Sequence, residues 1–200
     1  MSGPKVIVSY PVYEAMKPRP LFANFMLQRR LMKDEMLGKY STKTIVHGPR
    51  SPIRSIRNTT AQMALDSGAD AFLFIDDDMM PAEDILERLL EAEKEIVAPL
   101  FHVWNANAPP CVFKKNGDGK PEQWFDHPQN ELFECDGVGS GVLLVQTSVL
   151  KKIPEPWFYF DKTEHSMDVN FCKAAQEAGI SIWCDSRLPV HQLGENLIVV

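Results

Sequence analysis

Residues 71–75 read AFLFI, and three aspartates, Asp76, Asp77 and Asp78, follow them directly. The apolar run is continuous rather than alternating, which is typical of a parallel strand that is covered on both faces. Such a strand favours an α/β fold with helices packed on both sides of a sheet. The sequence therefore predicts a buried parallel strand that ends in three adjacent carboxylates.

Strand-like and helix-like segments alternate along the rest of the chain, without an internal repeat or a linker. The other predicted strands are residues 6–10, 44–46, 96–100, 142–145 and 180–184. The predicted helices are residues 20–37, one that Ser55 caps and Gly68 ends, residues 82–95, and residues 166–178, while residues 102–133 form a hairpin or excursion. This order predicts a single α/β domain over residues 1–200, with a mostly parallel central sheet flanked by helices.

Composition narrows the classes of function. The net charge of −6 disfavours a general attraction to nucleic acid or to an anionic membrane, although Lys and Arg cluster modestly over residues 29–57. No apolar run approaches the roughly 20 residues that span a bilayer, and no signal peptide is recognisable, so we expect a cytoplasmic protein without membrane insertion. The four cysteines form no metal or disulfide pattern and are expected to be reduced thiols; they are Cys111, Cys135, Cys172 and Cys184.

The three aspartates suit a divalent cation. Ligands of open parallel sheets bind beyond the carboxyl ends of the strands. On an extended segment Asp76 and Asp78 would point to one side and Asp77 to the other. Two carboxylates presented together are suitable ligands for Mg²⁺ or Mn²⁺. A simpler interpretation is that Pro81 opens a helix whose N-terminus favours acids; it accounts for Glu83 and Asp84 but not for three consecutive aspartates before them.

Several motifs in the same order resemble one enzyme family. IDDDMMP (75–81) resembles the DxD motif of GT-A-fold nucleotide-sugar glycosyltransferases, in which the acids bind a metal and a diphosphate. RSIRNTTAQMALDSGADAFLFIDDD (54–78), GVGSGVLLVQTSVLKKIPEPWF (137–158) and MDVNFCKAAQEAGISIWCDSRLPVHQLG (167–194) are similar to successive segments of the family-2-like group. The similarity spans about residues 5–194. It implies the GT-A fold, a nucleotide-sugar donor and a metal cofactor.

The resemblance and the residue types together assign the donor side of the site. The expected metal ligands are Asp76, Asp78 and His191, holding Mn²⁺ or Mg²⁺. His191 enters because it follows the last predicted strand and matches a late histidine of the family. The residues expected at the donor nucleotide and diphosphate are Tyr10, Pro11, Tyr13, Arg54, Arg57, Asp76 and Asp77. Arginines pair well with diphosphates, and Arg57 with Asn58 matches the family pattern.

The glycine-rich segment GVGSG (137–141) is assigned to the sugar and acceptor side. Its spacing is GxGxG and a strand follows it, so it lacks the geometry of a dinucleotide-binding loop, which opens a helix. Glycines at this place would let the backbone approach a sugar closely. The expected contacts to the sugar or acceptor are Asp136, Gly139, Ser140 and Gly141.

The catalytic base is open between two acids. The late helix of the family often begins with Glu-Asp, whereas this chain has Met167-Asp168. If the base is the second acid of the pair, it is Asp168; if it is the first, Glu164 is the nearest substitute.

The sequence therefore predicts a metal-dependent glycosyltransferase, of the hexosyl- or pentosyltransferase kind, with a UDP-sugar favoured as donor. The sugar would pass to an acceptor hydroxyl whose identity, like the oligomeric state, the sequence leaves open, and nucleic acid is disfavoured as a partner by the negative net charge. Two alternatives remain: a metal-dependent nucleotidyltransferase and a catalytically silent module that binds a sugar nucleotide.

Overall fold

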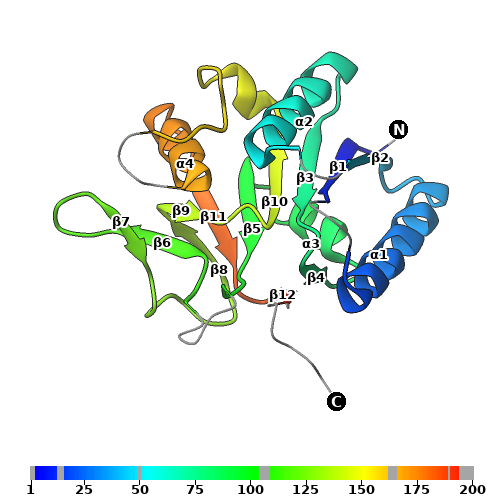
Figure 1. The fold of residues 1–200 in the computed structure, drawn as a ribbon, viewed down its shortest axis with the longest axis horizontal. Helices are drawn as coiled ribbons and strands as arrows, with labels where there is room; N and C mark the ends of the chain where they lie inside the picture. Colours follow the sequence, from blue (N-terminus) through cyan, green and yellow to red (C-terminus); the bar gives the residue numbers. More distant parts are fainter. Residues whose placement is uncertain are drawn as a thin grey trace.

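A seven-stranded sheet forms the centre of the molecule, in the order β2-β1-β3-β10-β5-β11-β8 (Figure 1). The computed structural model describes residues 3–12, 16–48, 51–103, 109–161, 166–188 and 190–193. The strands are β1 (Lys5–Pro11), β2 (Ser41–His47), β3 (Ala71–Ile75), β5 (Ile96–Pro99), β8 (Leu132–Cys135), β10 (Val142–Gln146) and β11 (Ile182–Asp185). β2, β1, β3, β5 and β11 run in one direction, and β10 and β8 run in the other. The sheet is therefore mainly parallel, which confirms the predicted fold class.

Helices cover both faces of this sheet. The helices are α1 (Pro18–Met36), α2 (Ile53–Ser67), α3 (Ile85–Glu91) and α4 (Met167–Glu177), with a 3₁₀ helix at Thr147–Lys151. Buried residues of α2 and α4 belong to one hydrophobic cluster, and those of α1 and α3 belong to a second cluster. None of the helices in the described residues combines the length and the apolar character needed to cross a bilayer.

The strand β3 divides its side chains between the two clusters. Phe72 and Phe74 lie in the cluster with α2 and α4, whereas Ala71, Leu73 and Ile75 lie in the cluster with α1 and α3. All five side chains are at most 1% exposed. Successive side chains of a strand point to opposite faces, so a strand buried on both sides must be apolar at every position. This is the physical origin of the continuous AFLFI run.

Two smaller sheets flank the central one. β4 (Met79–Pro81) pairs antiparallel with β12 (Val190–Gln192). β6 (Val112–Lys115) pairs with β7 (Pro121–Gln123) on one side and with β9 (Gly137–Val138) on the other. The hairpin of β6 and β7 extends from the body of the molecule (Figure 1) and forms part of the predicted excursion over residues 102–133.

Two local predictions are wrong. Pro81 does not open a helix, because it lies in β4 opposite Val190, and α3 begins only at Ile85. Ser55 does not cap α2, because the helix already begins at Ile53 after Pro52. The predicted end of α2 is confirmed, since Gly68 follows the helix with a left-handed φ of 63°.

A buried charge cluster fastens α1 to the sheet. The Asp34 side chain is 1% exposed and accepts hydrogen bonds from Arg30 Nε at 2.6 Å and from the Tyr40 hydroxyl at 2.9 Å. Lys39 Nζ lies 3.3 Å from the same carboxylate. Burial alone would raise the pKa of Asp34, but these hydrogen bonds outweigh burial and hold the pKa below its ordinary value. The ionised carboxylate therefore contributes to the stability of the fold.

We expect Asp34→Asn to lower the free energy of unfolding by about 1–3 kcal/mol near neutral pH, because the buried carboxylate loses its charge-assisted hydrogen bonds. The folded pKa is depressed, so this contribution is present above the ordinary carboxyl pKa and is lost as the pH falls through the folded pKa. Urea unfolding of wild type and Asp34→Asn would be measured from about pH 7 to about pH 3. The free energies of unfolding of the two proteins should converge as the pH falls. Exposed Glu35→Gln is the matched control, and a pH-independent difference for Asp34→Asn would contradict the role of its charge.

Candidate functional site

The three aspartates form a tight turn at the end of β3. The Asp76 carbonyl accepts a hydrogen bond from the Met79 amide at 3.0 Å, and the Asp76 amide donates to the Gly141 carbonyl at 2.8 Å. All three aspartates line one cavity of about 300 Å³. The prediction that Asp77 points away from Asp76 and Asp78 is therefore wrong, because side chains alternate on an extended segment and not around a turn.

The cavity lies at the carboxyl ends of two neighbouring parallel strands. β1 ends at Pro11 and β3 ends one residue before Asp76, and these strands pair in parallel. The rest of the lining comes from the residue after β1 and from the entry into α2; these residues are Val12, Ser51, Pro52, Ile53 and Ile56. A ligand-sized hollow at this edge of a mainly parallel sheet is where open α/β sheets bind their ligands.

Arg57 lies beneath the aspartate turn as a buried cation. Its side chain is 3% exposed, and Nη2 donates to both carboxylate oxygens of Asp76 at 3.0 Å. The guanidinium carbon lies 4.7 Å from the centre of the Phe74 ring. Its Nε and Nη1 are buried without a hydrogen-bond partner among the described residues. In this arrangement Arg57 holds and orients Asp76, and its predicted contact with a diphosphate remains a prediction.

The carboxylates of the site carry more negative charge than this one arginine balances. Burial raises the pKa of Asp76 to about 7, and the charges of Asp168 and Asp78 add to the effect of burial while Arg57 opposes it. The side chain of Asp76 nevertheless remains 28% exposed to solvent. Burial likewise raises the pKa of Asp78. A cation in the cavity would relieve this crowding.

Two residues that the sequence reasoning missed lie close to Asp78. Gln192 Nε2 donates to Asp78 Oδ2 at 2.8 Å, and the Leu193 amide donates to the Asp78 carbonyl at 2.8 Å. The positive charge of Lys17 acts on Asp78 in the direction that lowers its pKa, against the larger effect of burial. No sequence signal pointed to Gln192, because its contact depends on the pairing of β12 with β4.

The predicted ligand His191 is the strand neighbour of Gln192. It is exposed and stands opposite Met80 in the pairing of β12 with β4. Side chains alternate along a strand, so His191 and Gln192 point to opposite faces of this two-stranded sheet. The structure brings Gln192 to Asp78, and the role of His191 in metal binding stays a prediction.

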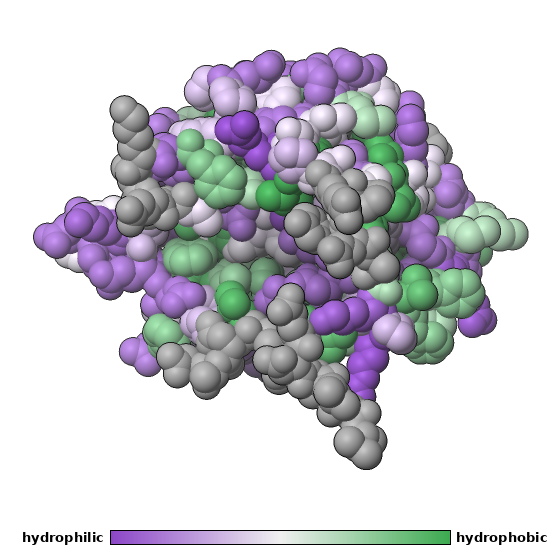
Figure 2. All heavy atoms as spheres, in the orientation of Figure 1, coloured by the Kyte–Doolittle hydropathy of each residue, from purple (hydrophilic) through white to green (hydrophobic). Residues whose placement is uncertain are grey.

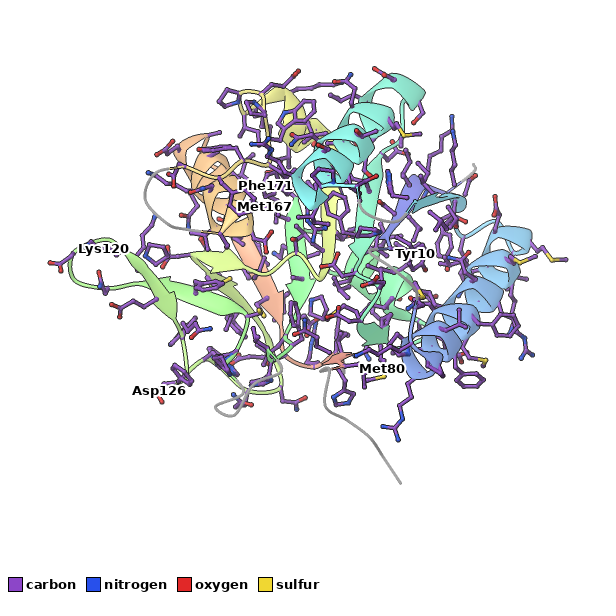
Figure 3. The ribbon with its side chains drawn as sticks, viewed as in Figure 1. Tyr10, Met80, Lys120, Asp126, Met167 and Phe171 are labelled. Carbon is purple, nitrogen blue, oxygen red and sulfur yellow. The ribbon has the colours of Figure 1, made fainter. Side chains whose placement is uncertain are left out.

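Asp168 reaches the site from the first turn of α4. Ser166 caps this helix by accepting a hydrogen bond from the Val169 amide at 3.4 Å. Both oxygens of Asp168 are held by Ser140, whose hydroxyl donates to Oδ1 at 2.5 Å and whose amide donates to Oδ2 at 3.2 Å. Met167 is 7% exposed and packs in the hydrophobic core. The position where the family has its first acid therefore faces the protein interior here (Figure 3).

The glycine segment before β10 packs tightly against the protein. A Cβ on Gly139 would lie 2.9 Å from Phe101 Cζ and 3.1 Å from Cys111, and one on Gly141 would lie 3.0 Å from Phe101 Cζ. A side chain at either position would therefore have to displace its protein neighbours. The predicted contact of Gly139 and Gly141 with a sugar remains a prediction.

Asp136 lies apart from the aspartate cavity. Its carboxylate accepts hydrogen bonds from the Lys115 amide at 2.8 Å and from Gln176 Nε2 at 3.1 Å, and it lines a separate hollow between α4 and the hairpin of β6 and β7. These contacts connect β6 to α4. The predicted contact of Asp136 with a sugar or acceptor stays a prediction.

The remaining predicted residues are placed as follows. Pro11 lines the aspartate cavity, and Arg54 is exposed at the start of α2. Tyr10 is 3% exposed in the core, and its hydroxyl accepts a hydrogen bond from Gln28 Nε2 at 2.9 Å. Tyr13 and Glu164 lie outside the described residues.

The donor set fits a divalent ion that a substrate helps to hold. Within the described residues, no three His, Cys, Asp or Glu side chains are grouped so as to hold a metal ion. Mg²⁺ is typically bound by one or two carboxylates together with substrate phosphates and water rather than by an all-protein cage. The crowded, incompletely balanced carboxylates of Asp76 and Asp78 suit this kind of site.

Comparisons with known proteins bear on the fold of the chain. No family model and no curated protein matches the sequence. Among solved structures, A197 from STIV is similar with a TM-score of 0.65 and 17% identity, over 96% of this chain and 86% of that one. S. aureus TarS (residues 1–349), in complex with UDP-GlcNAc, has a TM-score of 0.52 and 16% identity over 98% of this chain and 61% of that one. Inositol-1-phosphate CTP transferase from T. maritima has a TM-score of 0.52 and 8% identity over 100% of this chain and 93% of that one.

The chain has the fold of the GT-A-type nucleotide-sugar transferases. A Drosophila β-1,4-galactosyltransferase 7 variant, crystallised with manganese, UDP-Gal and xylobiose, is also similar, with a TM-score of 0.50 and 13% identity over 96% of this chain and 71% of that one. Glycosyl and nucleotidyl transferases thus share this fold, so the fold by itself does not separate the two reactions.

We expect Gly139→Ala to lower the free energy of unfolding by about 1–3 kcal/mol, because the new methyl group must displace Phe101 or Cys111 in a packed interior. Gly117→Ala is the matched control, since a Cβ there meets nothing within 4 Å. Urea unfolding of the two variants measures the difference. An unchanged stability for Gly139→Ala would show that this segment can move away from Phe101.

Proposed function

We propose that this protein is a metal-dependent glycosyltransferase that moves a sugar from a nucleoside-diphosphate sugar, with UDP-sugars favoured, to an acceptor hydroxyl. The fold and the carboxylate-lined cavity at the sheet edge support a nucleotide-sugar donor. A bound Mn²⁺ or Mg²⁺, held by Asp76 and Asp78, would supply positive charge for the departing diphosphate.

The position of Asp168 is the observation that most strongly supports glycosyl transfer. This carboxylate is oriented by two hydrogen bonds from Ser140 and lies close enough to Asp76 for its charge to raise the pKa of that residue, where burial is the largest cause. A sugar transfer that inverts configuration uses donor-binding acids and a separate acid that accepts a proton from the acceptor hydroxyl. This pairing of Asp76 with Asp168 supplies both.

Each side chain has a defined part in this proposal. Arg57 holds the Asp76 carboxylate, and Gln192 holds that of Asp78, so both acids are oriented toward a donor in the cavity. Asp168 takes the proton from the acceptor hydroxyl as the new glycosidic bond forms, because each of its oxygens keeps a lone pair beyond the one that Ser140 uses. The nucleoside diphosphate leaves with the electrons of the bond that is broken.

The released nucleotide distinguishes the reactions. Purified protein would be incubated with a panel of nucleotide sugars and Mn²⁺, and the products would be separated by anion-exchange chromatography. We expect a nucleoside diphosphate, from slow hydrolysis of the donor or from transfer to an added acceptor. In a parallel incubation with a nucleoside triphosphate, a sugar phosphate and Mn²⁺, release of pyrophosphate would instead identify a nucleotidyltransferase. Donor binding without turnover in either incubation would identify a silent module.

Asp78→Asn should weaken Mn²⁺-dependent binding of UDP by at least about tenfold, because the neutral amide is a poorer ligand for a hard cation. Calorimetric titration of UDP with and without Mn²⁺ measures this loss. Glu83→Gln is the matched control, since this exposed acid follows closely along the chain but does not line the cavity. Equal affinities for Asp78→Asn and wild type would remove Asp78 from the metal site.

Asp168→Asn should reduce sugar transfer by about 10²-fold or more, the usual scale of a general base, while UDP binding stays close to wild type. Glu177→Gln, an exposed acid at the far end of α4, is the matched control. Glu164→Gln tests the other acid. If Glu164→Gln abolishes transfer and Asp168→Asn does not, the assignment of the base is wrong.

A further inference from the structure

The outward face of α1 carries large apolar side chains along the whole helix, interspersed with charged residues. Six large side chains on α1 or at its C-terminus are between 54% and 88% exposed. They are Leu21, Phe22, Phe25, Met32, Met36 and Leu37, here called the α1 face. A helix of 19 residues is roughly 28 Å long, so this surface is extensive. Figure 2 shows hydrophobic residues at the surface in the region that α1 occupies in Figure 1.

This helix reverses the usual distribution of polarity. A surface helix normally turns its apolar stripe to the core and its polar side to water. In α1 the buried side includes Asn24 and Asp34 as well as Leu27 and Leu31. Leu27 and Leu31 pack in the core and Asn24 Nδ2 donates to the Met79 carbonyl at 3.2 Å, which holds the helix with its phenylalanines outward. A fixed, extended apolar surface of this kind indicates a docking site.

An apolar groove continues the α1 face toward the edge of the sheet. The groove has a volume of about 420 Å³ and lies between α1 and the edge strand β2. Leu21 and Phe25 line one side and Val46, which is 66% exposed, lines the other. Val12 lines both this groove and the aspartate cavity, so the two features adjoin.

The charges around the α1 face are mainly positive. Arg19, Arg29 and Lys33 are exposed, and none has an ion-pair partner among the described residues. Of the two acids of the helix, Asp34 is buried in its ion pairs, whereas Glu35 is exposed and accepts hydrogen bonds from the Ser41 and Thr42 hydroxyls, which leave its negative charge in place. The helix therefore presents three exposed cations and one exposed acid beside its large apolar side chains.

We propose that the α1 face binds an anionic lipid surface, with α1 lying in the plane of the interface. Apolar side chains flanked by Arg and Lys are the pattern of interfacial helices, which bury their apolar face at the headgroup boundary and attract anionic lipids. A second copy of the chain fits less well. A two-fold contact through this face would bring Arg29 and Lys33 of both copies into one interface, with more cations than acids.

The net charge of −6 is compatible with this docking. Charges more than a Debye length of about 8–10 Å from the lipid surface are largely screened at physiological salt. Three of the four exposed charges on α1 are cations, so the local charge at the interface favours anionic lipid.

Flotation of the purified full chain with lipid vesicles tests the proposal. Wild type should bind vesicles that contain about one third phosphatidylglycerol at least about tenfold better than neutral phosphatidylcholine vesicles, because each interfacial cation contributes roughly fivefold. Phe22→Ser with Phe25→Ser should weaken binding to the anionic vesicles by at least about tenfold. The double variant Arg29→Gln with Lys33→Gln should also weaken binding to the anionic vesicles by at least about tenfold. It should remove most of the preference for anionic over neutral vesicles.

Matched controls lie on the other side of the molecule. Phe125→Ser removes a phenylalanine that is 62% exposed, and Lys120→Gln with Lys173→Gln removes two exposed cations. Figure 3 labels Lys120 at the side opposite α1. These variants should bind vesicles within about twofold of wild type, the change expected when no interfacial charge is lost.

Three results would overturn the proposal. The first is no vesicle binding by wild type. The second is equal loss in the α1-face variants and the controls. The third is a dimer in sedimentation velocity that Phe25→Ser dissociates while vesicle binding stays unchanged, which would assign the α1 face to a second copy. Circular dichroism and thermal unfolding of each variant confirm that the exposed substitutions leave the fold intact.

Discussion

The ion pair between Arg57 and Asp76 is the interaction on which the site depends. β3 runs through the core and delivers Asp76 to its edge, and α2 packs on the sheet so that Arg57 lies beneath the turn. The guanidinium is almost fully buried against Phe74, so the loss of its partner would leave an uncompensated charge in the interior. This pair therefore couples the packing of α2 to the position of the carboxylates.

Main-chain hydrogen bonds assemble the rest of the site around this pair. The Asp76 amide binds the segment that leads into β10, and the Asp78 carbonyl receives the amide of Leu193 after β12. Ser140 of the first segment then orients Asp168 on α4. Three distant parts of the chain thus meet at one turn, where negative charge is concentrated.

Much of the fold could be predicted because it rests on local patterns. The continuous apolar run of residues 71–75 predicted a doubly covered strand, and this strand packs against helices on both sides. The ordered motifs predicted the nucleotide-sugar transferase fold. The geometry of the aspartates could not be predicted from the pattern, because the turn forms through the Met79 amide and through the pairing of β4 with β12. The same pairing removes Pro81 from the start of α3 and brings Gln192 to Asp78.

The sequence by itself determined which chemical groups this protein can use and which face of each element is apolar, because hydrophobic periodicity and residue type act over a few neighbouring positions. It also indicated an acid near the start of the last helix. Only the tertiary structure decided that Asp168 is held by Ser140, that Met167 faces the core, and that Gly139 and Gly141 pack against Phe101. It also decided that α1 turns its phenylalanines outward, because Leu27 and Leu31 pack in the core and Asn24 donates a hydrogen bond to the Met79 carbonyl. These outcomes depend on contacts between residues far apart in the chain, which no local pattern encodes.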